Sequence, residues 1–311
     1  MSLSVGIVGL PNVGKSTLFN ALLKKQQAYV ANFPFATVEP NVGMVPVPDE
    51  RLEKLAEIYR SPIVPATCEF VDIAGLIKGA SKGEGLGNKF LSHIREVDAI
   101  CHVVRAFSDP DIIKQGVTDP KGDFEVVNLE LAIADSEHPD APALAAKPIL
   151  VCLNVDEEDL KNAKEKETKF AQEVGLKEDQ VIAICAKTES ELAELTLTEQ
   201  TEYLQNMGVD KSGLERLIKK AFATLGLITF LTAGEKEVRA WTVKKGTDAV
   251  TAAGVIHSDF TKNFIKADVC EFNDFISSGG WKNAREKGKV RSEGKDYLIK
   301  DGDVVEFKIG T

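Results

Sequence analysis

The feature that most constrains this chain is a glycine-rich loop near its N-terminus. Residues 9–16 read Gly-Leu-Pro-Asn-Val-Gly-Lys-Ser, which fits the spacing GxxxxGK[ST]. They follow an apolar run at residues 3–8 and open a helix-compatible segment. A strand, a loop and a helix in this order point backbone N–H groups and the positive end of a helix at a phosphate group. The motif therefore predicts a nucleotide-binding loop.

The side chains of this loop have distinct expected roles. Lys15 should reach the β- and γ-phosphates, and the hydroxyl of Ser16 should ligate Mg²⁺. Glycine lets the backbone fold closely around the phosphates. The residues expected to bind the nucleotide here are Asn12, Val13, Gly14, Lys15, Ser16 and Thr17.

Apolar runs alternate with amphipathic segments over the first two thirds of the chain. The runs lie at residues 3–8, 68–73, 99–104, 148–153 and 181–185. Buried strands separated by helices predict an α/β fold with a mainly parallel sheet and helices on both faces. Residues 42–47 are expected to add an antiparallel edge strand.

After Leu227 the pattern changes to short strands separated by Gly and Asp turns, with one helix-compatible stretch at residues 248–256. This order predicts a small mixed sheet with a helix packed across it. We therefore expect two domains, a nucleotide-binding domain at residues 1–225 and a second domain at residues 226–311.

A second motif supports the first. Residues 71–75, Val-Asp-Ile-Ala-Gly, end an apolar strand in DxxG, which places Asp72 where a carboxylate can hold Mg²⁺ and Gly75 where its N–H can sense a γ-phosphate. Between the two motifs, Thr37 is a candidate third Mg²⁺ ligand. The alternative is that Thr37 is an ordinary loop residue.

The expected base-reading element departs from the NKxD rule of guanine-specific proteins. The strand at residues 148–153 is followed by Asn154-Val155-Asp156-Glu157, so Glu157 stands at the Asp position and Val155 at the Lys position. A site without the short carboxylate loses its best means of rejecting ATP. Asn154 retains an amide that can pair with adenine, and Ala186 lies in a Cys-Ala-Lys turn expected beside the base.

The composition indicates a globular, acidic protein. Acidic residues number 48 and basic residues 38, giving a net charge of −10, which argues against a protein that coats nucleic acid through bulk charge. No signal peptide or long apolar segment is apparent, so we expect a cytoplasmic protein with neither membrane nor DNA as a partner. The five separated cysteines predict reduced core residues, and no zinc motif is present.

One local charge reversal stands out. Residues 282–295 hold six basic and two acidic side chains, a net charge of +4. This stretch is either an RNA-contacting surface or a solvated loop, and Arg239 and Trp241 are candidates for added stacking. His102 is expected to be a hydrogen-bonded strand residue rather than a catalytic base, and His93 a solvated one.

With these residues in hand, the chain resembles the YchF / Obg-like ATPase family of P-loop NTPases. The similar strings are GLPNVGKST, NFPFAT, VDIAGLIKGASKGEGLGN, NVDE, FLTAGEKEVRAWTVKKGT and GKDYLIKDGDVVEFKIG. They span nearly the whole chain. The resemblance implies a Ras-like nucleotide domain, a C-terminal β-grasp (TGS) domain, and hydrolysis of ATP in preference to GTP.

The resemblance also implies a long helical hairpin between the strands that end near Val104 and begin near Pro148. Here residues 119–148 read as a remnant of it, with the start of the first helix at residues 124–137. Two explanations stay open: a true deletion, or a sequence from which the hairpin residues have been left out.

Hydrolysis is expected to be slow without a partner, because Leu76 follows DxxG where many GTPases place a water-orienting Gln. Related proteins with Asn at the position of Asn12 use it to hold K⁺ near the bridging oxygen, so Asn12 is either a K⁺-binding residue or a cap of the loop. Lys15, Asn12 and Gly75 form the expected catalytic set.

The family resemblance suggests the ribosome as the partner, with the large subunit as the expected surface. We therefore expect a nucleotide-switched ATPase that acts with the ribosome or a translation-linked partner. The alternatives are a nucleotide-sensing scaffold that does not hydrolyse ATP, and an ordinary GTPase in which Glu157 acts like Asp.

Overall fold

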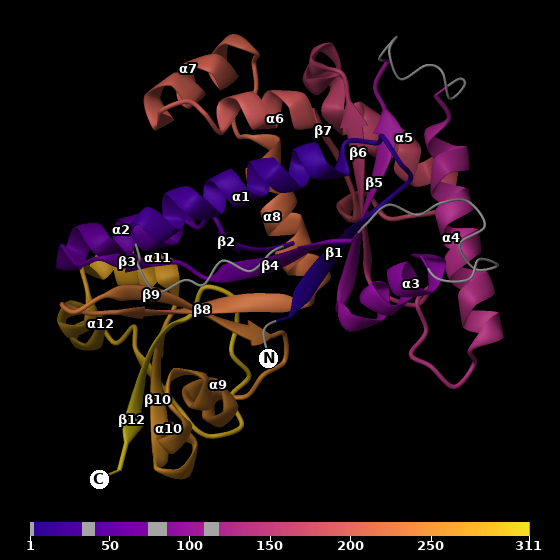
Figure 1. Cartoon of the computed structure of the whole chain (residues 1–311). Coiled ribbons are helices and arrows are strands. Elements are labelled where there is room, and N and C mark those ends of the chain that lie inside the picture. The colour runs from indigo at the N-terminus through magenta and orange to yellow at the C-terminus, as the bar shows by residue number, and fades with distance from the viewer. Residues whose placement is uncertain (1–2, 33–40, 74–85, 109–117, 311) are drawn as a thin grey trace. The chain divides into compact units, whose positions relative to one another are not determined.

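The computed structural model describes residues 3–32, 41–73, 86–108 and 118–310 (Figure 1). The chain forms two compact units. The first consists of residues 1–46 and 68–225, and the second of residues 47–67 and 226–311.

The first unit is built on a six-stranded sheet with the order β2-β4-β1-β5-β6-β7. Its strands are β1 (Ser4–Val8), β2 (Val42–Pro46), β4 (Thr67–Asp72), β5 (Ala99–Ala106), β6 (Ile149–Val155) and β7 (Val181–Ile184). Strand β1 pairs in parallel with β4 and β5, and β5, β6 and β7 continue this parallel pairing. The predicted mainly parallel sheet is confirmed, and β2 lies at its edge.

Helices cover both faces of this sheet. They are α1 (Lys15–Asn32), α3 (Leu86–Glu96), α4 (Pro120–Glu137), α5 (Ala163–Val174), α6 (Ala186–Leu192), α7 (Leu197–Asn206) and α8 (Gly213–Thr224), with short 3₁₀ turns η3 (Glu157–Asn162) and η4 (Glu178–Gln180). In Figure 1, α3, α4 and α5 lie on one side of the sheet and α1, α6 and α8 on the other. All five residues of β1 are buried, as expected for a parallel strand covered on both faces.

The remnant of the expected hairpin forms one ordered helix. Four side chains of α4 that share one face, Phe124, Val127, Leu131 and Ala134, are buried against the sheet. The helix begins at an Asp119 cap, whose carboxylate accepts from the backbone N–H of Gly122 at 3.0 Å. It ends at Glu137, where the sequence HPDAP interrupts the helical pattern.

Asp135 closes the short connection that follows. Its carboxylate accepts from the backbone N–H of Leu144 at 2.8 Å and from that of Ala145 at 2.9 Å. Leu144 is fully buried in the same core as α3 and α4. One acidic side chain in the last turn of α4 therefore fixes the path of the chain back to β6.

The second unit is built on a separate mixed sheet with the order β11-β10-β12-β8-β9-β3. Its elements are α2 (Glu50–Tyr59), β3 (Ile63–Val64), β8 (Leu227–Ala233), β9 (Val238–Lys244), α9 (Ala249–Ile256), α10 (Ser258–Lys262), β10 (Phe264–Cys270), α11 (Phe272–Ser278), α12 (Trp281–Glu286), β11 (Arg291–Glu293) and β12 (Val304–Ile309). Helix α9 packs on the sheet through Ala249, Ala252 and Ala253. The expected C-terminal sheet with a helix across it is confirmed.

One segment differs from the domain division expected from the sequence. Residues 47–67 belong to the second unit rather than to the nucleotide-binding unit. Strand β3 pairs in parallel with β9, and Arg51 of α2 donates to Asp301 at 2.8 Å and to Thr229 at 2.8 Å. A two-residue strand paired across more than 170 positions leaves no local pattern to recognise.

No helix within the described ranges combines the length and the apolar character needed to span a membrane.

We predict that Asp135→Ala lowers the free energy of unfolding by about 2 kcal/mol, because it leaves two backbone N–H groups without their charged acceptor. Urea denaturation measures this loss. Ser136→Ala is the matched control, since the Ser136 hydroxyl donates to the Ile133 carbonyl oxygen of its own helix. Equal stability losses in the two variants would show that Asp135 does not hold the connection.

Candidate functional site

The glycine-rich loop leaves the sheet at the end of β1 and leads directly into α1, which begins at Lys15. Gly9 and Gly14 have positive φ angles of 152° and 98°. A Cβ on Gly9 would lie 2.4 Å from the carbonyl oxygen of Val103, and one on Gly14 would lie 2.2 Å from Nδ2 of Asn154. The loop can follow this path only with glycine at both positions.

Lys15 lies in the loop with its charge turned inward. Its side chain is buried, and Nζ donates to the carbonyl oxygen of Leu10 at 2.7 Å. Burial lowers the pKa of Lys15, whereas the nearby carboxylate of Asp72 acts to raise it. Burial in turn raises the pKa of Asp72, and the charge of Lys15 acts to lower it. The opposite charges of the two motifs therefore influence each other, and Asp72 lies on β4 opposite Ile7 of β1, the strand that leads into the loop.

Asn154 connects the loop to the neighbouring turn. Its side chain is buried at the end of β6, where Nδ2 donates to the carbonyl oxygen of Val13 at 3.0 Å. Its Oδ1 accepts from the backbone N–H of Ala186, the first residue of α6, at 2.9 Å. Of the residues expected near the base, Asn154 and Ala186 therefore lie together beside Val13 of the loop. The Asn154 amide keeps one N–H and one lone pair for a ligand.

Val155 and Glu157 of the NVDE string lie in different environments. Val155 is buried in the hydrophobic core beside Val104 and Phe124, so its side chain faces away from the loop surface. Glu157 is exposed at the start of η3, and its Oε1 accepts from the hydroxyl of Tyr203 on α7 at 3.2 Å. Burial raises the pKa of Tyr203, and the adjacent Glu157 carboxylate raises it further.

Two of the expected metal ligands are described. Ser16 is exposed in the first turn of α1, and Asp72 ends β4 half-buried. One hydroxyl and one carboxylate are oxygen donors of the kind that Mg²⁺ prefers. Within the described residues no group of three or more His, Cys, Asp or Glu side chains is close enough to hold a metal ion. Thr37, Gly75 and Leu76 lie outside the described residues.

Asn12 has a left-handed backbone conformation, with φ of 62°, and an exposed side chain. Asparagine tolerates this conformation better than most residues. Its side chain makes no hydrogen bond with the part of the chain that the structure describes, so no cap of the loop by Asn12 is seen there.

His102 is buried in β5, but its environment differs from the expectation of a hydrogen-bonded residue. Neither ring nitrogen has a hydrogen-bond partner among the described residues, and the ring stacks on Phe124 with centroids 5.4 Å apart. Burial lowers the pKa of His102 to about 3, and the charge of Lys15 lowers it in the same direction. A neutral ring in the core is consistent with a structural role. The five cysteines are free and buried, as predicted.

Sequence reasoning missed three side chains around the site. Tyr203 lies on a helix without any motif, Asp156 accepts from Ser108 N and Oγ at 2.9 Å, and buried Glu189 accepts from Gly213 N at 2.6 Å at the start of α8. Burial raises the pKa of Glu189. Only Asp156 carried a sequence signal, because it lies inside the NVDE string.

Known proteins share both parts of this chain. Residues 4–155 match a family model described as a 50S ribosome-binding GTPase, and residues 227–310 match the model YchF-GTPase_C, described as a protein of unknown function (DUF933). The chain is 46% identical to the ribosome-binding ATPase YchF of Bacillus subtilis and 44% identical to that of Escherichia coli O157:H7, with 99% of both chains covered in each pair.

A solved structure is similar over the same length. The structure of the Schizosaccharomyces pombe YchF GTPase has 35% sequence identity and a TM-score of 0.86, covering 99% of this chain and 98% of that chain. The alignment with the B. subtilis protein spans 364 positions, whereas this chain has 311 residues, so at least 53 of those positions have no residue here. A shortened internal segment agrees with this difference, and its place at residues 119–148 stays a prediction.

We predict that Gly14→Ala weakens nucleotide binding at least tenfold, because the new methyl group would displace the Asn154 amide and strain the loop. Isothermal titration calorimetry measures the affinity. Gly175→Ala is the matched control: it also has a positive φ, of 71°, but no atom lies within 4 Å of the added Cβ. An unchanged affinity in Gly14→Ala would contradict this account of the loop.

Proposed function

The chain belongs to the YchF family, and from this membership and the geometry of its site we propose that it binds ATP in preference to GTP. It hydrolyses ATP to ADP and phosphate in an Mg²⁺-dependent reaction linked to the ribosome. The observation that carries the proposal is a glycine-rich loop that leads from β1 into α1 at buried Lys15, with Asp72 at the end of the neighbouring strand β4. A lysine for the phosphates and a carboxylate for a metal are the groups that phosphoryl transfer needs.

Lys15 has a local partner that a phosphate can replace. In the described structure Nζ binds the Leu10 carbonyl oxygen, a neutral acceptor. Phosphate oxygens carry negative charge and form stronger hydrogen bonds with an ammonium group than a carbonyl does. The N–H groups at the start of α1 add their partial positive charge. Nucleotide binding would then move Lys15 from Leu10 to the β- and γ-phosphates.

Ser16 and Asp72 are the described residues that would hold Mg²⁺, and Thr37 is the proposed third ligand. When bound, Mg²⁺ neutralises charge on the β- and γ-phosphates. Gly75 would contribute its N–H at the γ-phosphate. Asn12, whose exposed amide is free of described partners, is the proposed K⁺-binding residue, and with Leu76 after DxxG we propose slow hydrolysis in the absence of a partner.

The proposed preference for ATP rests on the hydrogen bonds that the side chains expected beside the base can offer. A guanine reader must offer both oxygens of one carboxylate to the N1–H and 2-amino groups. Here one oxygen of Glu157 accepts from Tyr203, while Val155 cannot provide the long side chain of the usual lysine. The remaining N–H and lone pair of Asn154 suit the N7 and N6–H groups of adenine.

The proposed partner is the large ribosomal subunit, and the proposed location is the cytoplasm. Support comes from the similar proteins of B. subtilis and E. coli, which are named ribosome-binding ATPases, and from the 50S ribosome-binding GTPase family matched by residues 4–155. Two alternatives keep specific support. A GTPase is suggested by the name of the S. pombe relative, and a sensor without turnover is suggested by Leu76.

We predict that Lys15→Ala reduces ATP turnover at least hundredfold while leaving the melting temperature nearly unchanged, because it removes the charged phosphate contact. Turnover is measured with and without ribosomes, and with K⁺ or Na⁺ as the only monovalent cation. Lys24→Ala on the same helix is the control, since Lys24 pairs at the surface with Glu194. Wild-type turnover in a folded Lys15→Ala protein would overturn the ATPase proposal, and absent turnover in the wild type with ribosomes would favour the sensor.

We predict that Glu157→Asp combined with Tyr203→Phe raises the affinity for GTP relative to ATP by about tenfold, since a shorter carboxylate freed from Tyr203 regains up to two hydrogen bonds to guanine. Val155 is left unchanged because a lysine there would be buried. Calorimetry with both nucleotides measures the ratio. Tyr297→Phe, in the second unit, is the control, and tighter binding of GTP than ATP by the wild type would refute the proposed preference.

A further inference from the structure

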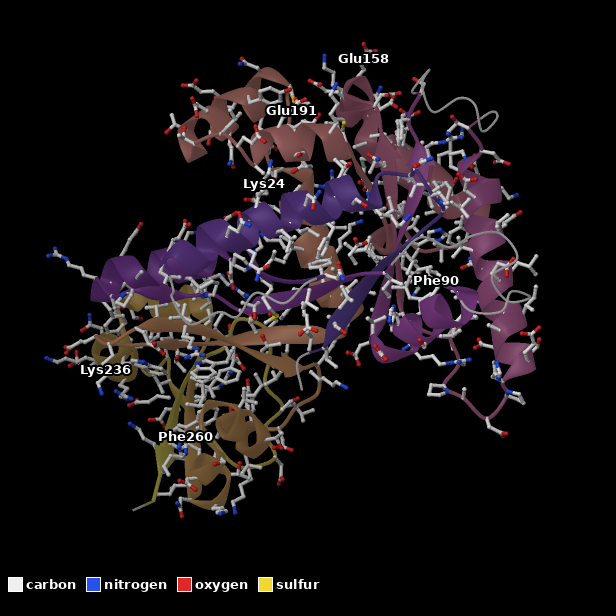
Figure 2. All side chains as sticks on the ribbon, in the orientation of Figure 1. Lys24, Phe90, Glu158, Glu191, Lys236 and Phe260 are labelled. Carbon is white, nitrogen blue, oxygen red and sulfur yellow. The ribbon has the colours of Figure 1, made fainter. Side chains whose placement is uncertain are left out.

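An aromatic pocket lies within the second unit, separate from every nucleotide motif. It has a volume of about 940 Å³, and its walls include the rings of Trp241, Trp281, Phe260, Phe307 and Tyr59. The whole chain has only two tryptophans, and both line this pocket. Figure 2 labels two lining residues from different elements, Lys236 in the turn after β8 and Phe260 on α10. None of these residues has a part in the proposed ATPase site.

Neither indole offers a free hydrogen-bond donor, and the Trp241 ring is stacked on Phe230 with centroids 6.4 Å apart. Trp241 Nε1 donates to Thr232 Oγ1 at 2.9 Å, and Trp281 Nε1 donates to the Ala233 carbonyl oxygen at 3.2 Å. Recognition of proline-rich peptides uses aromatic-lined grooves, and indole donors that would bind a peptide carbonyl are already used here. A ligand with its own flat, stacking surface fits these walls better.

Each indole also carries a cation on its ring. The guanidinium carbon of Arg239 lies 4.0 Å from the centroid of Trp241, and that of Arg285 lies 5.2 Å from the centroid of Trp281. Nucleobases stack on aromatic rings and on Arg guanidinium planes with little dependence on sequence. The Trp281 ring and the Arg285 guanidinium, which both line the pocket, therefore suit unpaired bases.

Several basic side chains of residues 282–295 are paired with carboxylates in the structure. Arg285 pairs with Glu306, Lys289 with Asp274 at 3.2 Å, and Arg291 with Glu271 at 3.2 Å. Lys282 at the pocket has no ion pair among the described residues, and neither has Lys236. Three acidic residues line the pocket. Glu237 pairs with Arg239 at 3.7 Å and Glu306 pairs with Arg285, so Glu235 is the one without an ion pair among the described residues. The uncompensated charge at the rim is positive.

We propose that this pocket binds single-stranded RNA, with unstacked bases against Trp281 and the Arg285 guanidinium and phosphates near Lys236 and Lys282. Base-paired RNA keeps its base faces covered, so a duplex cannot use these walls. The inference rests on the proposed ribosome association for the source of the RNA, which would be an unpaired segment of ribosomal RNA.

The two tryptophans make the test specific. A single-stranded RNA dodecamer of mixed sequence is titrated into the full chain while intrinsic tryptophan fluorescence is recorded, and the same dodecamer in duplex form is the competitor. We expect saturable quenching by the single strand and none by the duplex. Raised salt should weaken binding. The slope of log K against log salt concentration should become shallower by about 0.7 for each phosphate contact that a substitution removes.

Lys236→Glu combined with Lys282→Glu should weaken the single-strand affinity at least tenfold. The matched control is Lys244→Glu combined with Lys262→Glu, which makes the same charge change in the same unit outside the pocket and should bind like the wild type. All four lysines are exposed, and melting temperatures verify the fold. ATP turnover without ribosomes should be unchanged in both variants.

Absent quenching, equal quenching by the duplex, or equal loss in the pocket and control variants would overturn the proposal. Quenching by a proline-rich peptide but not by RNA would identify a peptide site instead and overturn it as well. If the wild type showed no ATP turnover, only the proposed function would be refuted. The RNA-binding proposal would stand, because RNA binding is measured without nucleotide or ribosomes.

Discussion

The nucleotide-binding unit depends on one buried amide. Asn154 donates to the Val13 carbonyl oxygen and accepts from the Ala186 N–H, so it joins the glycine-rich loop, β6 and α6 at a single point. A buried polar group of this kind is stabilising only while its partners stay in place. Gly14 is the corresponding constraint on the loop, because any side chain there would occupy the position of the amide. The residue expected to read the base thus first holds the phosphate loop in position.

The local parts of this architecture were predictable from the sequence. The loop at residues 9–16, the DxxG carboxylate and the five apolar runs each carry their signal within a few neighbouring residues. In the structure the strand that ends at Asp72 pairs with the strand that leads into the loop. Parallel strands bring their carboxyl ends to one edge of the sheet, which is why separate motifs converge there.

The parts that the sequence did not predict are contacts between distant segments. Tyr203 reaches Glu157 across 46 positions, and β3 joins β9 although it has only two residues. His102 lies in an apolar strand as expected, but its stacking on Phe124 depends on how α4 packs. No composition or periodicity encodes which side chain of a helix meets which loop. Those details come from tertiary packing, and they decide how the base-side carboxylate is presented.

The charge distribution of the second unit also depends on contacts between distant segments that the sequence does not reveal. Counting residues 282–295 gives a basic stretch, yet Arg285, Lys289 and Arg291 each meet a carboxylate from another element. Exposed ion pairs contribute little to stability, but they reduce the field available to an anionic partner. A binding surface on this unit is defined by the lysines that stay unpaired and by what lies beside them, rather than by the sum of charges.

Helix α4 shows that the nucleotide unit does not need a long hairpin to complete its core. Phe124, Val127, Leu131 and Ala134 are buried against the strands and against α3 and α5, and Asp135 closes the connection to buried Leu144. The predicted hairpin would begin beyond Glu137, after the buried side chains of α4. Its loss would therefore leave the loop, Asn154 and the base-side residues in place.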